Sequence, residues 1–86
     1  MTKTELKMAL KLHHDWKVNR RRDYATLLME YADGKILSMF ESAISPEILF
    51  YHANGISDYE IDWHAVYISA VRIMSEKAKE VANGTL

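Results

Sequence analysis

Apolar side chains recur at helical spacing near the start of the chain. They would share one face of an α-helix, while basic residues follow the opposite face. The apolar face consists of Leu6, Ala9, Leu10, His13 and Trp16. Just before it, Thr2-Lys3-Thr4-Glu5 has the pattern of a capping box, in which hydroxyl and carboxylate satisfy free backbone N–H groups. We therefore predict a first amphipathic helix over residues 3–18.

A longer apolar stripe follows, and its members recur at i, i+3, i+4 and i+7. The stripe consists of Ala25, Leu28, Met29, Ala32, Ile36, Met39, Phe40 and Ala43. We predict one helix over residues 23–44, continuous or kinked at Gly34, because a glycine inside a helix costs only about 1 kcal/mol. The alternative is an α+β fold, since Asp33-Gly34 is typical of a β-hairpin turn between segments 27–32 and 35–40.

Start and stop signals divide the rest of the chain into two more helices. Ser45-Pro46-Glu47 is typical of a helix start and Asn54-Gly55 of a helix end, which predicts a short helix over residues 46–53. Ser57-Asp58-Tyr59-Glu60 has the pattern of a second capping box and Asn83-Gly84 of a second stop, which predicts a long helix over 58–82. The sequence thus predicts an all-α bundle of three long helices and one short helix, forming a single domain over residues 1–86.

The last predicted helix carries apolar residues on two sides. Opposite its broad apolar face lies a small patch formed by Ile61, Ala65 and Ile68, beside Arg72. A helix that is apolar on both sides is usually contacted on both sides. In so small a protein the second contact is either the segment around Ile48 or another subunit. We predict that Ile61, Ala65, Ile68 and Arg72 bind a protein partner or a second copy of the chain in a homodimer.

Composition narrows the class of protein. Of the 86 residues, 49% are apolar and none is cysteine, which argues against a disordered chain, a disulfide scaffold and a cysteine nucleophile. So short a chain buries only about 60% of its unfolded surface, so a partner would add needed stabilisation. The longest stretch without Asp, Glu, Lys or Arg is residues 48–57, too short to span a bilayer. We expect a cytoplasmic protein with no membrane segment.

The formal net charge of −1 conceals an uneven distribution. Residues 1–22 hold seven basic and two acidic residues, a charge of +5, whereas residues 23–86 hold four basic and ten acidic residues, a charge of −6. The candidate residues for binding nucleic acid or an acidic partner are Lys3, Lys7, Lys11, His14, Lys17, Arg20, Arg21 and Arg22. The competing interpretation is that they pair with acidic residues of the same fold.

The residues that could perform chemistry do not form a recognisable site. His13 and His14 are adjacent in a helix, so their side chains point about 100° apart and cannot converge on a metal. Asp58-x-Glu60-x-Asp62 resembles the start of a calcium loop, but Trp63 and Ser69 stand where that loop needs glycine and glutamate. No phosphate-binding loop or nucleophile motif is present. We predict no catalytic residues, no metal and no cofactor.

These observations favour a binding protein. Tyr, Trp, Met and Arg, which are enriched where protein partners dock, are well represented among the 86 residues. We predict a small protein–protein interaction module that regulates or inhibits a larger partner, such as a bacterial or phage accessory protein. The alternative is a nucleic-acid-binding protein that uses the basic first helix and the Arg20–Arg22 turn.

Overall fold

Four α-helices and one 3₁₀ turn make up the structure, a computed structural model that describes residues 3–84. In chain order they are α1 (Lys3–Asn19), α2 (Arg21–Leu28), α3 (Asp33–Ala53), η1 (Asp58–Glu60) and α4 (Trp63–Ala82). The prediction of an all-α bundle is confirmed. The α+β alternative is wrong, because the described part of the chain has no strand and Asp33-Gly34 opens α3.

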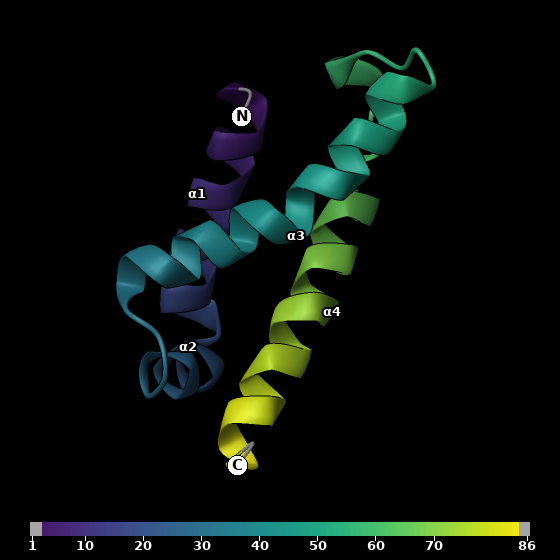
Figure 1. The fold of residues 1–86 in the computed structure, drawn as a ribbon. Coiled ribbons are helices and arrows are strands. Elements are labelled where there is room, and N and C mark those ends of the chain that lie inside the picture. Colours follow the sequence, from purple (N-terminus) through teal and green to yellow (C-terminus); the bar gives the residue numbers. More distant parts are fainter. Residues whose placement is uncertain (1–2, 85–86) are drawn as a thin grey trace.

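The central element of the bundle is α3, which packs on α1 and on α4 (Figure 1). The short α2 lies at the end of the bundle near the C-terminus and contacts α4 (Figure 1). The result is an elongated molecule with principal extents of 41 × 23 × 20 Å.

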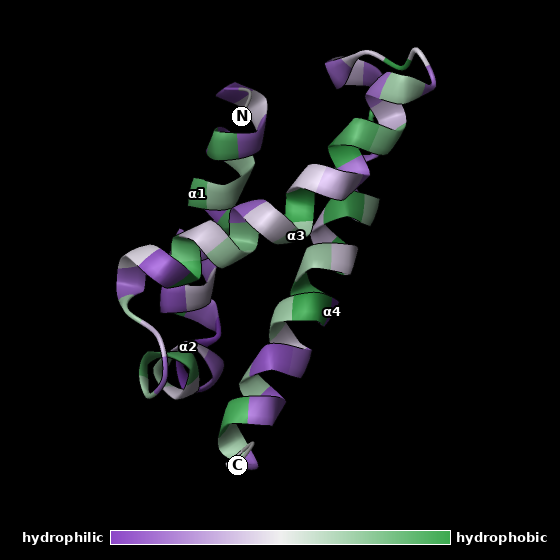
Figure 2. Ribbon diagram, in the orientation of Figure 1, coloured by the Kyte–Doolittle hydropathy of each residue, from purple (hydrophilic) through white to green (hydrophobic). Residues whose placement is uncertain are grey.

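The core is centred on the contact between α1 and α3. The rings of Trp16 and Phe40, both fully buried, meet edge to face with centroids 5.3 Å apart. The face of α1 that packs inward differs from the predicted one, because Leu6 and Leu10 are 40% and 47% exposed whereas Glu5 is buried. Figure 2 shows hydrophobic and hydrophilic residues interleaved along the second halves of both α3 and α4.

The predicted helix over residues 23–44 is wrong, because the chain turns between α2 and α3. The carbonyl of Leu27 accepts hydrogen bonds from the N–H groups of Glu30 and Tyr31, at 3.0 and 2.8 Å, and these bonds end α2. The first half of the predicted apolar stripe is therefore wrong. Leu28 and Met29 are exposed, and Leu27 is buried in their place.

A tertiary contact ties the first turn of α3 to α1. The Asp33 carboxylate, in the first turn of α3, lies 3.0 Å from the His13 ring and 3.1 Å from the Lys17 ammonium. Both partners belong to α1, so the contact lies where the start of α3 meets that helix. Gly34 lies within α3 at an open position and produces no break there.

The predicted helix boundary at Ser45-Pro46 is also wrong. Pro46 lies inside α3, which continues from Asp33 to Ala53. A proline in a helix interior removes one backbone hydrogen bond and bends the axis, and α3 changes direction near its middle (Figure 1). Ile44 and Ile48, on either side of the proline, are fully buried. Their burial in the core outweighs the local cost of the proline.

The last helix starts later than predicted. The Ser57 hydroxyl donates to the Glu60 carboxylate at 2.7 Å across η1, and α4 begins only at Trp63. Asp62 caps α4 by accepting from the N–H of Ala65 at 3.1 Å. The predicted stops are confirmed, since both helices end before a glycine of positive φ, Gly55 at 74° and Gly84 at 75°. The first predicted capping box includes Thr2, which lies outside the described residues.

Candidate functional site

A groove of about 460 Å³ runs between α1 and α4. Its α1 side and floor consist of Met8, Lys11, Leu12, His14, Asp15, Val18 and Asn19. Its α4 side consists of Trp63, His64 and Tyr67. A neighbouring hollow of about 320 Å³ shares Met8, Lys11 and Trp63 with it and adds Thr4 and Lys7. Together these residues define the α1–α4 groove, which follows one edge of α1 from Thr4 to Asn19.

A polar bridge crosses the groove. The Tyr67 hydroxyl of α4 donates to the Asp15 carboxylate of α1 at 2.9 Å, and the Asn19 amide donates to the same carboxylate at 2.7 Å. The hydrogen bonds from Asn19 and Tyr67 hold the pKa of Asp15 below its ordinary value. Burial, and then the Asp15 carboxylate, raise the pKa of Tyr67. The bridge therefore joins an ionised carboxylate to a neutral phenol at pH 7 and ties α1 to α4.

A second set of hydrogen bonds, which we call the Asp58 clasp, holds the end of the groove at Trp63. The Asp58 carboxylate accepts from Thr4 of α1 at 2.8 Å and lies 2.6 Å from the His52 ring of α3. Its carbonyl accepts from the Trp63 indole N–H at 2.9 Å. The hydrogen bonds from His52 and Thr4 lower the pKa of Asp58. Since the clasp joins α1, α3, η1 and α4, it positions the indole that forms one wall of the groove.

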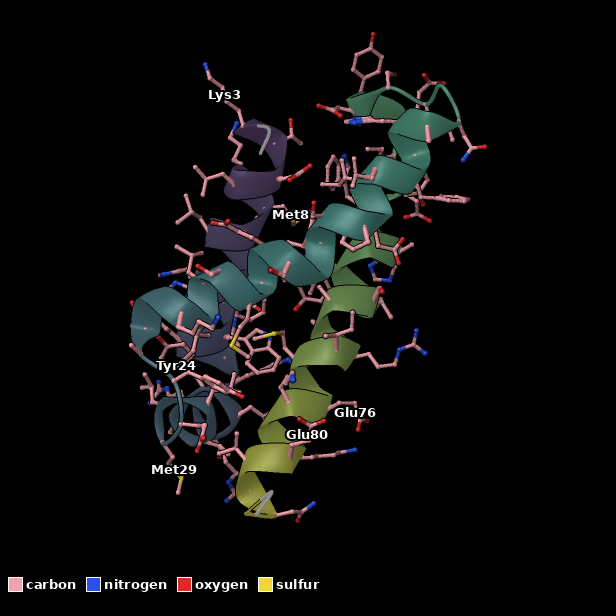
Figure 3. The ribbon with its side chains drawn as sticks, viewed as in Figure 1. Lys3, Met8, Tyr24, Met29, Glu76 and Glu80 are labelled. Atoms are coloured by element: carbon pink, nitrogen blue, oxygen red, sulfur yellow. The ribbon has the colours of Figure 1, made fainter. Side chains whose placement is uncertain are left out.

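The structure divides the predicted basic residues into three groups. Lys7, Lys11 and His14 line the groove or its extension. Others are used within the fold: the Lys17 ammonium contacts Asp33, the Arg20 guanidinium lies 5.7 Å from the Trp16 ring centroid, and Arg21 donates to the Val18 carbonyl at 3.3 Å. Lys3 and Arg22 are exposed, and Figure 3 shows Lys3 pointing away from the bundle.

The predicted partner-binding patch on the last helix is split by the structure. Ala65, Ile68 and Arg72 are exposed on the outer face of α4, and Ile68 is 52% exposed. Ile61 does not belong with them, because it precedes α4 and is only 5% exposed. The reason is the late start of α4, which leaves Ile61 in extended backbone that turns its side chain into the core. Binding of a partner through the other three residues stays a prediction.

The groove was not predicted from the sequence, because the pattern of α1 was interpreted as one apolar and one basic face. Met8, Leu12, Asp15 and Asn19 recur at i, i+4, i+7 and i+11, so they form a third edge of mixed character. That periodicity was visible in the sequence. The residues that face this edge from α4, Trp63 and Tyr67, are 44 or more positions away and could not be paired with it.

The histidines do not form a metal site. His13 and His14 diverge as expected: His13 is buried, with its ring 3.3 Å from the Tyr24 hydroxyl, and His14 is exposed in the groove. Within residues 3–84, no three His, Cys, Asp or Glu side chains are grouped in a way that could hold a metal ion. Within the same residues, no helix is both long enough and apolar enough to cross a bilayer.

Comparison with known proteins gives the chain no relative: no family model, curated protein or solved structure matches it. What the α1–α4 groove can bind therefore has to follow from the chemistry of its lining. That lining combines an apolar floor, an indole ring and two lysines at the rim.

Proposed function

We propose that this chain is a small cytoplasmic protein–protein interaction module, which regulates or inhibits a larger partner by docking a segment of it in the α1–α4 groove. The observation that carries the proposal is the groove itself, with Met8, Leu12 and Trp63 along its floor and wall. Trp and Met are enriched at protein interfaces, and Trp is prominent among the residues that dominate binding energy.

The groove is held open by the fold before any partner arrives. The bond between Tyr67 and Asp15 spans it, and the Asp58 clasp fixes Trp63 at one end. A binding surface that is already ordered loses little conformational entropy on association, which favours affinity. These contacts support a docking role, and we propose that binding proceeds without catalysis.

A pair of matched variants tests the proposal. Val18 lines the groove and is 48% exposed, whereas Leu28 lies outside it, at the end of α2, and is 46% exposed. Arginine near a helix C-terminus is compatible with the helix dipole, so Val18→Arg and Leu28→Arg should both fold. Each variant and the unmodified protein would be tagged, expressed in the native host and purified with whatever protein co-purifies.

We expect Leu28→Arg to retain a specific partner and Val18→Arg to lose it, with equal helix content by circular dichroism. Mass spectrometry would identify the partner, and titration with that purified protein would quantify the loss. Equal retention by both variants would show that the groove is not the docking site. The absence of any specific partner with the unmodified protein would count against an interaction module.

Binding of nucleic acid is a second candidate function, favoured by the cations along α1. Lys7 and Lys11 form no ion pair within residues 3–84 and are free to meet phosphates. Such binding would weaken steeply with salt and would be abolished by Lys7→Glu with Lys11→Glu. A gel-shift titration at low salt that shows no complex would eliminate this candidate.

A further inference from the structure

The length of the α1–α4 groove indicates a linear occupant. Its lining follows α1 from Thr4 to Asn19, a separation of fifteen residues, and therefore about 22 Å at 1.5 Å per residue. Small ligands bind in concave pockets that bury most of their surface. About four turns of a helix from a partner match this edge of α1, lying over the Tyr67–Asp15 bridge and meeting α4 at Trp63, His64 and Tyr67.

The apolar lining indicates that the occupant presents an apolar stripe. Met8, Val18 and Trp63 are accessible along the trough. The Trp63 indole N–H is already bonded to the Asp58 carbonyl, so the exposed part of this side chain is hydrocarbon. Recognition of an amphipathic helix by an apolar groove uses anchors at i, i+4 and i+7 on the helix, and the flexible thioether of Met8 can adapt to such anchors.

The charges around the groove indicate the sign of the charge that its occupant carries. Lys7 and Lys11 form no ion pair among the described residues. Asp15, the one carboxylate in the lining, is occupied by Asn19 and Tyr67. Asp15 keeps its negative charge, because Asn19 and Tyr67 are neutral, so the two lysines and this carboxylate give the lining a net charge of +1, with the cations at Lys7 and Lys11. A helix with acidic residues beside its apolar stripe complements it, whereas the same groove of a second copy would bring like charges together.

We propose that the α1–α4 groove binds an acidic amphipathic helix of about 15 residues from a partner protein. This inference rests on the proposed docking function and adds the chemistry of the docked segment. The apolar stripe of the helix contacts Met8, Val18 and Trp63, and its flanking carboxylates pair with Lys7 and Lys11.

The test uses two designed peptides of 16 residues. Both carry leucine at i, i+4, i+7 and i+11 of a helical sequence, with blocked ends. One has glutamate at every flanking position and the other has lysine. Each is titrated into the ¹⁵N-labelled protein, and the indole N–H signals of Trp63 and Trp16 are followed by NMR, since Trp16 is fully buried away from the groove lining.

We expect the glutamate peptide to bind and to shift the Trp63 indole signal more than that of Trp16. Lys7→Glu with Lys11→Glu should weaken that binding at least tenfold, which is about 1.4 kcal/mol, and should strengthen binding of the lysine peptide. Lys35→Glu is the matched control, because Lys35 is an exposed lysine of α3 outside the groove. Lys35→Glu should leave the affinity for each peptide within twofold of that of the unmodified protein.

Several results would overturn the inference. Equal affinity for the two peptides would show that charge does not select the occupant. Shifts that depend on protein concentration alone would place a second copy in the groove, and displacement of the peptide by a DNA duplex would place nucleic acid there. Failure of both peptides, together with a host partner that Val18→Arg loses, would refute the acidic helix and leave the docking function intact.

Discussion

Replacement of Trp16 by phenylalanine tests how the core tolerates a buried polar atom. Trp16 is fully buried, and its indole nitrogen has no hydrogen-bond acceptor among the described residues. Its ring meets Phe40 edge to face and lies under the Arg20 guanidinium. A phenylalanine ring can keep both contacts while removing the unpaired N–H.

Two opposing effects decide the result. Loss of two buried ring carbons costs about 1.5 kcal/mol, and a residual cavity of about 40 Å³ adds about 1 kcal/mol. Against this, an unpaired buried N–H costs about 1–3 kcal/mol, and the substitution relieves that cost. The free energy of unfolding of Trp16→Phe should therefore differ from that of the unmodified protein by no more than about 1.5 kcal/mol. Trp16→Ala should lose about 3–5 kcal/mol.

Urea unfolding followed by circular dichroism measures both variants. The linear extrapolation gives the free energy of unfolding, and an unchanged slope shows that the denatured state has not altered. A loss of about 3 kcal/mol or more in Trp16→Phe would refute the reasoning, because it would mean that the indole N–H has an acceptor in solution. A near-neutral result also yields a protein whose only tryptophan, Trp63, reports on the groove by fluorescence.

Three further predictions concern two glycines, the Asp58 clasp and the outer face of α4. Gly34→Ala should stabilise the protein by about 0.5–1 kcal/mol, since Gly34 is helical with open space around it. Gly55→Ala should destabilise it by about 1–2 kcal/mol, because Gly55 has φ 74°. Thermal unfolding temperatures equal to that of the unmodified protein would contradict both predictions. The lowered pKa of Asp58 means that its carboxylate stabilises the fold above about pH 4, and that this stabilisation is lost as pH falls through the lowered pKa. Asp58→Asn should therefore reduce the fall in unfolding temperature between about pH 5 and pH 2, and an unchanged fall would exclude a role for the clasp. If Ile68 forms a homodimer contact, Ile68→Asp should halve the mass measured by light scattering with helix content unchanged; a monomer in both proteins would end the homodimer prediction.

The fold class followed from local signals that tertiary structure did not override. Helical periodicity and two Asn-Gly stops predicted helices ending at residues 53 and 82, where α3 and α4 end. A glycine after each end supplies the positive φ that other residues resist. Such signals act within a few residues of the chain, so they can be recognised before the tertiary structure is known.

The helix starts were predicted less well, because competing local signals looked equally strong. Ser45-Pro46-Glu47 is typical of a start, yet burial of Ile44 and Ile48 carries α3 through it. Ser57 and Glu60 form their side-chain bond, yet they close a 3₁₀ turn, and Asp62 caps α4 instead. Packing energy spread over a whole helix exceeds the roughly 1 kcal/mol that a cap contributes.

The candidate site was predictable only in part. The sequence identified Lys7, Lys11 and His14 as an unusual cationic surface, and the structure places them beside an apolar trough. The contacts of Arg20 with Trp16 and of Arg21 with Val18 are local. The sequence could not show that Lys17 pairs with Asp33, sixteen residues away, because packing brings them together. Nor could it bring Trp63 and Tyr67 to α1.

Local sequence is enough to predict that the chain is helical, where two of its helices end and which end of it is cationic, because these properties depend on residues close together in the chain. Only the tertiary structure decided where the chain turns between α2 and α3, that Ile61 is buried, and that α1 and α4 enclose a groove. Each of these depends on contacts between residues far apart in sequence, such as Asp33 with Lys17 and Tyr67 with Asp15. Their energies arise only once the helices have packed.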